Sequence, residues 1–252
     1  MKYLQILLNQ PQGYLFCLVE GPDKEACAKV HQEAHGNIAC NILEITESDF
    51  SALLANKAKD GLDFTLNQDG SLDTGTRALL AIDILGVSES YNKARTLVND
   101  LFRRHGGRNV ESLGNQIVAV FDACSAAMDA GLDISNRISM DALPVEVRMG
   151  VDIGPPITER GNFFEDVCRS ASLFSFISGN CQMSISSRVM EHCHNNRGLV
   201  RDTTKIINPG DEKFLNHFMT CLENVWHCTD ISITRLAKEI GMSKSQLARR
   251  LN

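Results

Sequence analysis

Residues 78–86 have the sequence ALLAIDILG, an apolar run interrupted by a single acid, Asp83. A short apolar run of this kind predicts a buried β-strand over residues 78–84. Further along, apolar residues alternate strictly from Val145 to Ile153, the pattern of a half-buried strand. Around these two strands the patterns predict helices at 90–104, 123–132 and 165–177, a hairpin at 110–113 and 116–121, and a strand at 182–185. We therefore predict an α/β unit over residues 77–191.

The segments on either side of this unit have different patterns. Residues 1–53 predict strands at 3–8 and 14–20, a helix that begins after Asp23 and ends at Gly36, and a strand at 42–45. Residues 211–252 carry three apolar stripes at helical spacing. Residues 54–76 and 192–210 lose periodicity and gather turn-forming residues, so we predict two linkers there. The predicted fold class is α+β, with three segments.

Composition excludes several classes of protein. The 252 residues are 43% hydrophobic and have a net charge of −6, which excludes a disordered, collagen-like or disulfide-scaffold chain. An acidic molecule has no overall basic field, so any contact with DNA must be local. No apolar run approaches the roughly 20 residues that span a bilayer, so we predict no membrane partner. Nine irregularly spaced cysteines favour reduced thiols in the cytoplasm.

The C-terminal stretch 232–252, SITRLAKEIGMSKSQLARRLN, predicts two short helices joined by a glycine turn, a helix-turn-helix. Ser243 and Gln246 have the spacing of a capping box for the second helix. Five basic residues and two acids between 230 and 252 give a local net charge of +3. The alternative is a charged helical hairpin that binds no DNA. The residues predicted to contact DNA are Ser243, Lys244, Ser245, Gln246, Arg249 and Arg250.

These residues suit different parts of a DNA duplex. Gln246 suits adenine, Lys244 suits guanine or phosphate, and Arg250 favours phosphate. The stretch 214–252 resembles the start of the DNA-binding domain of AraC-type transcription regulators, in its LAKEIGMSKSQLARRL core and in the preceding Phe214-Leu215 helix. The family carries two helix-turn-helix units, and only the first has a counterpart in this sequence, so we expect a fragment or weakened DNA binding.

The middle segment resembles the class III adenylate and guanylate cyclases. The matching pieces, in order, are ALLAIDILG, RRHGGRNVESLGNQIVAVF, LPVEVRMGVDIG, NFFEDVCRSASLF and CQMSISSRV. The resemblance implies a cyclase-like α/β sandwich that pairs as a homodimer. It matches Asp83 to the first metal-binding carboxylate and Glu111 to the position that selects the purine.

Three matched positions depart from the cyclase pattern. Asn115 stands where the second carboxylate belongs, and an amide is a poor magnesium ligand. Cys168 and Ser172 replace the Asn and Arg that stabilise the transferring phosphate. We therefore predict a degenerate domain that dimerises or senses a ligand, and a chain that is not an enzyme. For Asp83, a leftover acid at a strand end is the open alternative.

The N-terminal stretch YLFCLVEGPDKEACAKVHQEAHG resembles part of a small ferredoxin-like family described as nickel-binding. His31 and His35 are four residues apart on one predicted helix, so their imidazoles can converge on nickel or zinc. Two ligands are too few for a tight site, and two polar histidines at a helix end are the alternative interpretation.

Together these patterns predict an AraC-type, sequence-specific DNA-binding transcription regulator. A degenerate cyclase-like domain, and possible metal binding, would control it. The alternatives are an active nucleotide cyclase with a regulatory tail, and a nickel- or zinc-binding protein. The sequence does not specify the small-molecule effector, the DNA target or the sign of regulation.

Overall fold

The computed structural model describes residues 2–36, 39, 41–54, 65–67, 70–110, 116–157, 163–193, 203–228 and 231–251. The chain divides into two compact units, residues 1–205 and residues 206–252, and each is described by itself. In the described residues, no helix is both long enough and apolar enough to cross a membrane.

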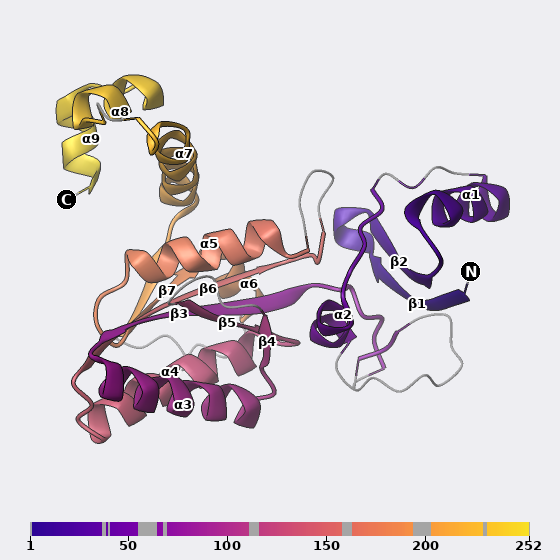
Figure 1. Cartoon of the computed structure of the whole chain (residues 1–252), viewed down its shortest axis with the longest axis horizontal. Helices are drawn as coiled ribbons and strands as arrows, with labels where there is room; N and C mark the ends of the chain where they lie inside the picture. Colours follow the sequence, from indigo (N-terminus) through magenta and orange to yellow (C-terminus); the bar gives the residue numbers. More distant parts are fainter. Residues whose placement is uncertain are drawn as a thin grey trace. The chain divides into compact units, whose positions relative to one another are not determined.

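A six-stranded sheet forms the centre of the first unit (Figure 1). Its order is β4 (Arg108–Val110), β5 (Gln116–Phe121), β3 (Arg77–Gly86), β6 (Val145–Gly154), β7 (Gln182–Ser186) and β8 (Thr204–Ile207). Strand β3 pairs antiparallel with β5 and β6, whereas β6 and β7 are parallel. The strands predicted from ALLAIDILG and from the 145–153 alternation are confirmed.

Strand β3 is apolar throughout because it is covered on both faces. Ala78, Leu80, Ile82 and Ile84 pack with helices α3 (Ser88–Arg104) and α4 (Cys124–Met140). Leu79 and Ala81 point the other way, toward α5 (Glu165–Phe176). Figure 1 shows α3 and α4 on one side of the sheet and α5 on the other. These layers make a mixed α+β fold.

Helix α5 lies unusually close to the sheet at Gly150 in β6. A Cβ at this glycine would lie 2.1 Å from the carbonyl oxygen of Ala171, so only glycine allows the approach. The close packing brings the buried face of α5 directly over β3 and β6.

The N-terminal hairpin packs on the side of the sheet that α5 covers. Strands β1 (Lys2–Asn9) and β2 (Tyr14–Glu20) pair antiparallel around a short 3-10 helix, η1 (Gln10–Gln12), which confirms the predicted hairpin. Leu7 of β1 is fully buried with Leu53, Leu79 and Phe164. Helix α2 (Glu47–Leu54) follows, and its last residues are buried.

Helix α1 (Lys24–His35) begins and ends as predicted. The Asp23 carboxylate accepts a hydrogen bond from the Ala26 N–H, and Gly36 ends the helix in the left-handed conformation. The strand predicted at 42–45 is wrong, since these residues form no strand, and among the described residues the sheet of the N-terminal hairpin contains only β1 and β2. Their half-buried side chains satisfy the apolar pattern without backbone pairing. A complete ferredoxin-like module is therefore not shown.

The predicted linkers contain ordered structure. Within 54–76, the Thr65 N–H donates to the Ile6 carbonyl and the Leu8 N–H donates to the Asp73 carbonyl, so Thr65 and Asp73 lie beside β1. Helix α6 (Ser187–His192) ends where the second predicted linker begins, and β8 lies within that linker. Both elements were missed because each is very short.

Arg77, at the start of β3, connects these parts. Its side chain is 2% exposed and makes a bidentate ion pair with Asp73, with both N···O distances at 2.9 Å. Its Nε lies 3.0 Å from both the Leu53 carbonyl oxygen and Asp122 Oδ1. One buried guanidinium therefore joins the end of α2, the segment before β3 and the turn after β5.

We predict that Arg77→Met strongly destabilises the first unit, because it leaves the Asp73 carboxylate buried without its partner. Breaking one side of a buried ion pair costs about 3–5 kcal/mol of unfolding free energy. Denaturant unfolding measures this loss. Arg103→Met, which removes an exposed pair with Asp100, is the control and should cost less than about 1 kcal/mol.

The double variant Arg77→Met/Asp73→Asn should recover part of the stability, because no unpaired charge remains buried. Equal stability of Arg77→Met and wild type would contradict the central role given to this pair.

Candidate functional site

The second unit consists of three helices, α7 (Pro209–Val225), α8 (Ile233–Ile240) and α9 (Lys244–Leu251). Phe214 and Cys221 of α7 pack with Ala237 and Ile240 of α8 and with Leu247 of α9. This apolar core fixes α9 through its single buried residue, Leu247. The opposite side of α9 is exposed.

Local hydrogen bonds define the turn between α8 and α9. The Ser232 hydroxyl caps α8 by accepting from the Arg235 N–H, as predicted. Gly241 ends α8 with φ of 73°, a conformation that favours glycine. The Ser243 hydroxyl accepts from the Gln246 N–H at 3.2 Å, and the Gln246 side-chain oxygen accepts from the Ser243 N–H at 2.9 Å. The predicted capping box is confirmed.

The predicted DNA-contacting residues differ in how free their side chains are. Lys244, Ser245, Gln246 and Arg249 are exposed on α9. The Gln246 amide oxygen is held by the capping box, which leaves its NH₂ group directed away from that bond. Arg249 Nε donates to the Ser245 carbonyl at 3.4 Å, a contact within its own helix.

Arg250 is engaged inside the unit. Its guanidinium carbon lies 4.4 Å from the centre of the Phe214 ring, a cation–π distance. Its NH2 group lies 3.4 Å from Asp211 Oδ1 and 3.5 Å from the Gly210 carbonyl oxygen. These contacts join the end of α9 to the start of α7, so a phosphate contact would have to compete with them.

Asp83 lies near the C-terminal end of β3, on the face covered by α5. Its neighbours in the sheet are Gln116 on β5 and Arg148 on β6. Its side chain is 6% exposed, and burial raises the pKa of its carboxyl group. Arg148 lowers this pKa and Glu146 raises it, and the net direction is upward. Arg148 is itself paired with Glu146 at 2.6 Å.

Gln116, the neighbour of Asp83 in the sheet, hydrogen-bonds to α5. Gln116, beside Asp83, donates from Nε2 to the Ser175 hydroxyl at 3.0 Å and to the Ser172 carbonyl at 3.4 Å. Cys168 lies one turn earlier on α5, and burial raises the pKa of its thiol. Glu111 and Asn115 lie outside the described residues. The roles of these matched residues stay predictions.

The two predicted metal ligands both lie on α1. His31 is half-buried, and the side chain of His35 is outside the described part of the chain. The described residues contain no group of three or more His, Cys, Asp and Glu side chains that could hold a metal ion. Binding of nickel or zinc by His31 and His35 stays a prediction.

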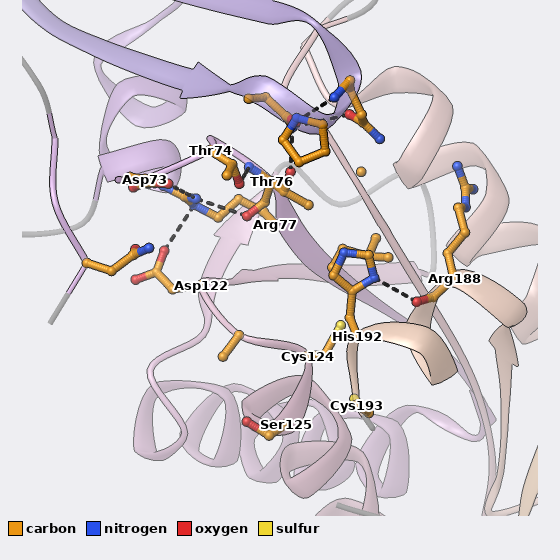
Figure 2. A pocket seen from close by; sticks show the side chains of 17 residues that line it. Asp73, Thr74, Thr76, Arg77, Asp122, Cys124, Ser125, Arg188, His192 and Cys193 are labelled. Atoms are coloured by element: carbon orange, nitrogen blue, oxygen red, sulfur yellow. Dashed lines mark hydrogen bonds and ion pairs between the residues drawn. The ribbon is translucent and has the colours of Figure 1, made fainter. Parts of the chain in front are cut away.

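Sequence reasoning missed a pocket at the other end of β3, with a volume of about 590 Å³ (Figure 2). It lies beside Arg77, Asp122 and the end of β6, and it also includes residues of α6. Arg188 of α6 pairs with the buried Asp152 carboxylate at 2.6 Å, and the His192 ring hydrogen-bonds to the Arg188 carbonyl. Because its lining comes from distant segments, no local pattern in the sequence indicates this pocket.

Comparison with known proteins gives structural matches only. No family model and no curated protein matches the sequence. A solved adenylate/guanylate cyclase/hydrolase from Silicibacter pomeroyi is 24% identical, with a TM-score of 0.42, over 48% of this chain and 81% of that one. The dimeric guanylyl cyclase domain of the RhoGC fusion protein from the fungus Blastocladiella emersonii is 17% identical, with a TM-score of 0.40, over 48% and 83%. The adenylyl cyclase CyaB from P. aeruginosa is 16% identical, with a TM-score of 0.39, over 48% and 81%.

These matches concern the fold of about half of the chain, and they give no support to the AraC-type or nickel-binding resemblances. They correct one prediction, that the chain is not an enzyme. The matched structures are named as cyclases, so that prediction is not retained. The matches do not show activity.

We predict that Asp83→Asn stabilises the protein at neutral pH. Since burial raises the pKa of Asp83, its ionised form is disfavoured in the folded state. The substitution removes this penalty, and Arg148 keeps Glu146 as its partner. The gain should shrink as the pH falls through the raised folded pKa and vanish below the unfolded pKa, where both states are protonated.

Chemical unfolding at neutral and acidic pH measures this difference. Asp100→Asn on the exposed side of α3 is the control, and it should change stability by no more than about 0.5 kcal/mol. A less stable Asp83→Asn variant at neutral pH would show that the ionised carboxylate stabilises the fold.

Proposed function

We propose that the protein is a sequence-specific DNA-binding transcription regulator, whose second unit contacts DNA through α9. The observation that carries the proposal is the capped turn between α8 and α9, which fixes α9 with Leu247 buried and Lys244, Ser245 and Arg249 exposed. A second helix held in this way can present its first turn to the major groove.

Charge supports the same assignment. Residues 230–252 carry a net charge of +3 in a chain whose total is −6. A segment of net positive charge in an acidic protein is an electrostatic footprint expected of nucleic-acid binding. Lys244 and Arg249 are the exposed cations of α9 that carry it, because Arg250 is engaged with Phe214 and Asp211.

The first unit would control DNA binding in this proposal. Its cyclase resemblance in sequence supports pairing as a homodimer, and a dimer would place two copies of α9 on two half-sites. A small-molecule effector would act through this unit. We also propose that the protein is a regulator of the AraC type and that it forms a dimer. Metal bound by His31 and His35 would affect its DNA binding.

A second candidate function is nucleotide cyclase activity at Asp83. The observation that favours it is a buried carboxyl group with a raised pKa, facing Gln116 and Arg148 at a strand end. Carboxyl groups with shifted pKa values are enriched at active sites. Asp83 would hold the metal ion that accompanies a nucleoside triphosphate, and Glu111 would select the purine.

For DNA binding, we predict that Lys244→Ala weakens affinity on all sequences and lowers the slope of log affinity against log salt by about one. The reason is the loss of one phosphate contact. Fluorescence anisotropy of the full chain with a labelled duplex pool measures this slope. Lys93→Ala removes an exposed lysine from the other unit and should leave the slope unchanged. A slope unaffected by Lys244→Ala would contradict the placement of α9.

Specificity has its own test, because Gln246 serves both cap and base contact. Gln246→Glu keeps the oxygen that accepts from Ser243, so α9 stays capped. It removes the amide donor that pairs with adenine, and a carboxylate accepts from cytosine instead. Selection from a random duplex pool should show a changed preference at one base pair, worth about 1–3 kcal/mol. An unchanged selected sequence would contradict a base contact by Gln246.

For the cyclase candidate, the purified chain incubated with GTP or ATP and manganese should form cyclic nucleotide, and Asp83→Asn should abolish product formation. The resemblance of Glu111 to the guanylate type favours GTP. Absence of product with both nucleotides, in protein shown to be folded, would remove this candidate.

A further inference from the structure

Two cysteines from distant parts of the sequence meet at one end of the pocket in Figure 2. Cys124 is the first residue of α4, and Cys193 directly follows α6. Cys193 packs against the apolar cluster that contains Cys124. The two side chains lie close enough for each to shift the pKa of the other's thiol. The pair belongs to neither the Asp83 region nor the DNA-binding unit.

The environment makes the two thiols unequal. The hydrogen bond to Cys193 raises the pKa of Cys124, and burial raises it further, so Cys124 keeps its proton. The same hydrogen bond lowers the pKa of Cys193, although burial and the nearby Asp129 carboxylate oppose this effect. Of the two thiols, Cys193 therefore has the lower pKa and ionises more readily. A more readily ionised thiol beside a buried, protonated thiol is the arrangement in which one sulfur attacks and the other resolves.

The two thiols also differ in their exposure to solvent. Cys193 is partly exposed, whereas Cys124 is 6% exposed. Both contribute to the wall of the pocket, whose volume of about 590 Å³ is that of a small-molecule site. Arg188 and His192 line the same pocket, so it offers a guanidinium and an imidazole to a polar ligand. A small reagent entering the pocket would meet Cys193 first.

Cys17 and Cys168 lack this combination. Burial alone raises the pKa of Cys17, and it is the main cause of the raised pKa of Cys168. Both thiols therefore remain protonated and react slowly.

We propose that Cys193 and Cys124 form a redox-active dithiol, which a low-molecular-weight disulfide entering the pocket oxidises to an intramolecular disulfide. The Cys193 thiolate attacks one sulfur of the small disulfide, forming a mixed disulfide and releasing one small thiolate. Cys124 then loses its proton to solvent and attacks the Cys193 sulfur, which expels the second small thiolate. The two protein thiols are oxidised, and one small disulfide is reduced to two thiols.

The test uses the full chain, reduced, freed of reductant and treated with oxidised glutathione. Remaining thiols are blocked with N-ethylmaleimide, and peptides are mapped by mass spectrometry without reduction. We expect a peptide pair joined through Cys124 and Cys193, with two glutathione thiols released for each chain cross-linked. Cys193 recovered only in its blocked form, or joined to a different cysteine, would overturn the proposal.

Variants separate the attacking from the resolving thiol. Cys193→Ser should abolish the reaction at Cys124. Cys124→Ser should stop the reaction at a stable glutathione adduct on Cys193, and thermal unfolding checks that this buried substitution leaves the protein folded. Cys181→Ser, at a half-buried cysteine outside the pair, should leave the cross-link unchanged. If folded Cys124→Ser forms no adduct on Cys193, or if Cys181→Ser removes the cross-link, the assigned order of attack is wrong.

Discussion

The buried ion pair between Arg77 and Asp73 is the constraint on which the first unit depends. A charged guanidinium away from water is stable only when its donors are paired, and here a carboxylate, two backbone carbonyls and a second carboxylate satisfy them. These partners come from α2, from the segment before β3 and from the turn after β5. Since Asp73 also accepts from the Gly75 N–H, the pair fixes the direction in which the chain enters β3.

Strand β3 carries a different charged group near each of its two ends. Its first residue, Arg77, borders the pocket that contains Cys124 and Cys193. Near its other end, Asp83 lies between Gln116 and Arg148, under α5. The apolar middle of β3 is packed on both faces and separates these groups. Burial raises the pKa of the Asp83 carboxyl group.

In the second unit, two residues that were predicted to contact DNA also make contacts that stabilise the unit. Gln246 completes the cap of α9, and Arg250 covers the Phe214 ring, although both residue types also suit DNA. Lys244 and Arg249 carry the exposed charge that remains. The short length of α9 explains these contacts. Because α9 has only eight residues, Gln246 in its first turn reaches the turn before the helix, and Arg250 near its end reaches α7.

The sequence by itself determined the features that depend on neighbours three or four residues away. These are the caps at Asp23, Ser232 and Ser243, the glycine ends of α1 and α8, and the apolar periodicity of β3, β6 and α5. Tertiary structure decided whether an apolar stretch pairs, which is why 42–45 forms no strand while the short β8 does. It also decided the sites: the Arg77 network, the Asp83 surroundings and the Cys124–Cys193 pair join residues distant in the chain. Burial and distance between such residues are properties of the packed molecule, and local pattern carries no information about them.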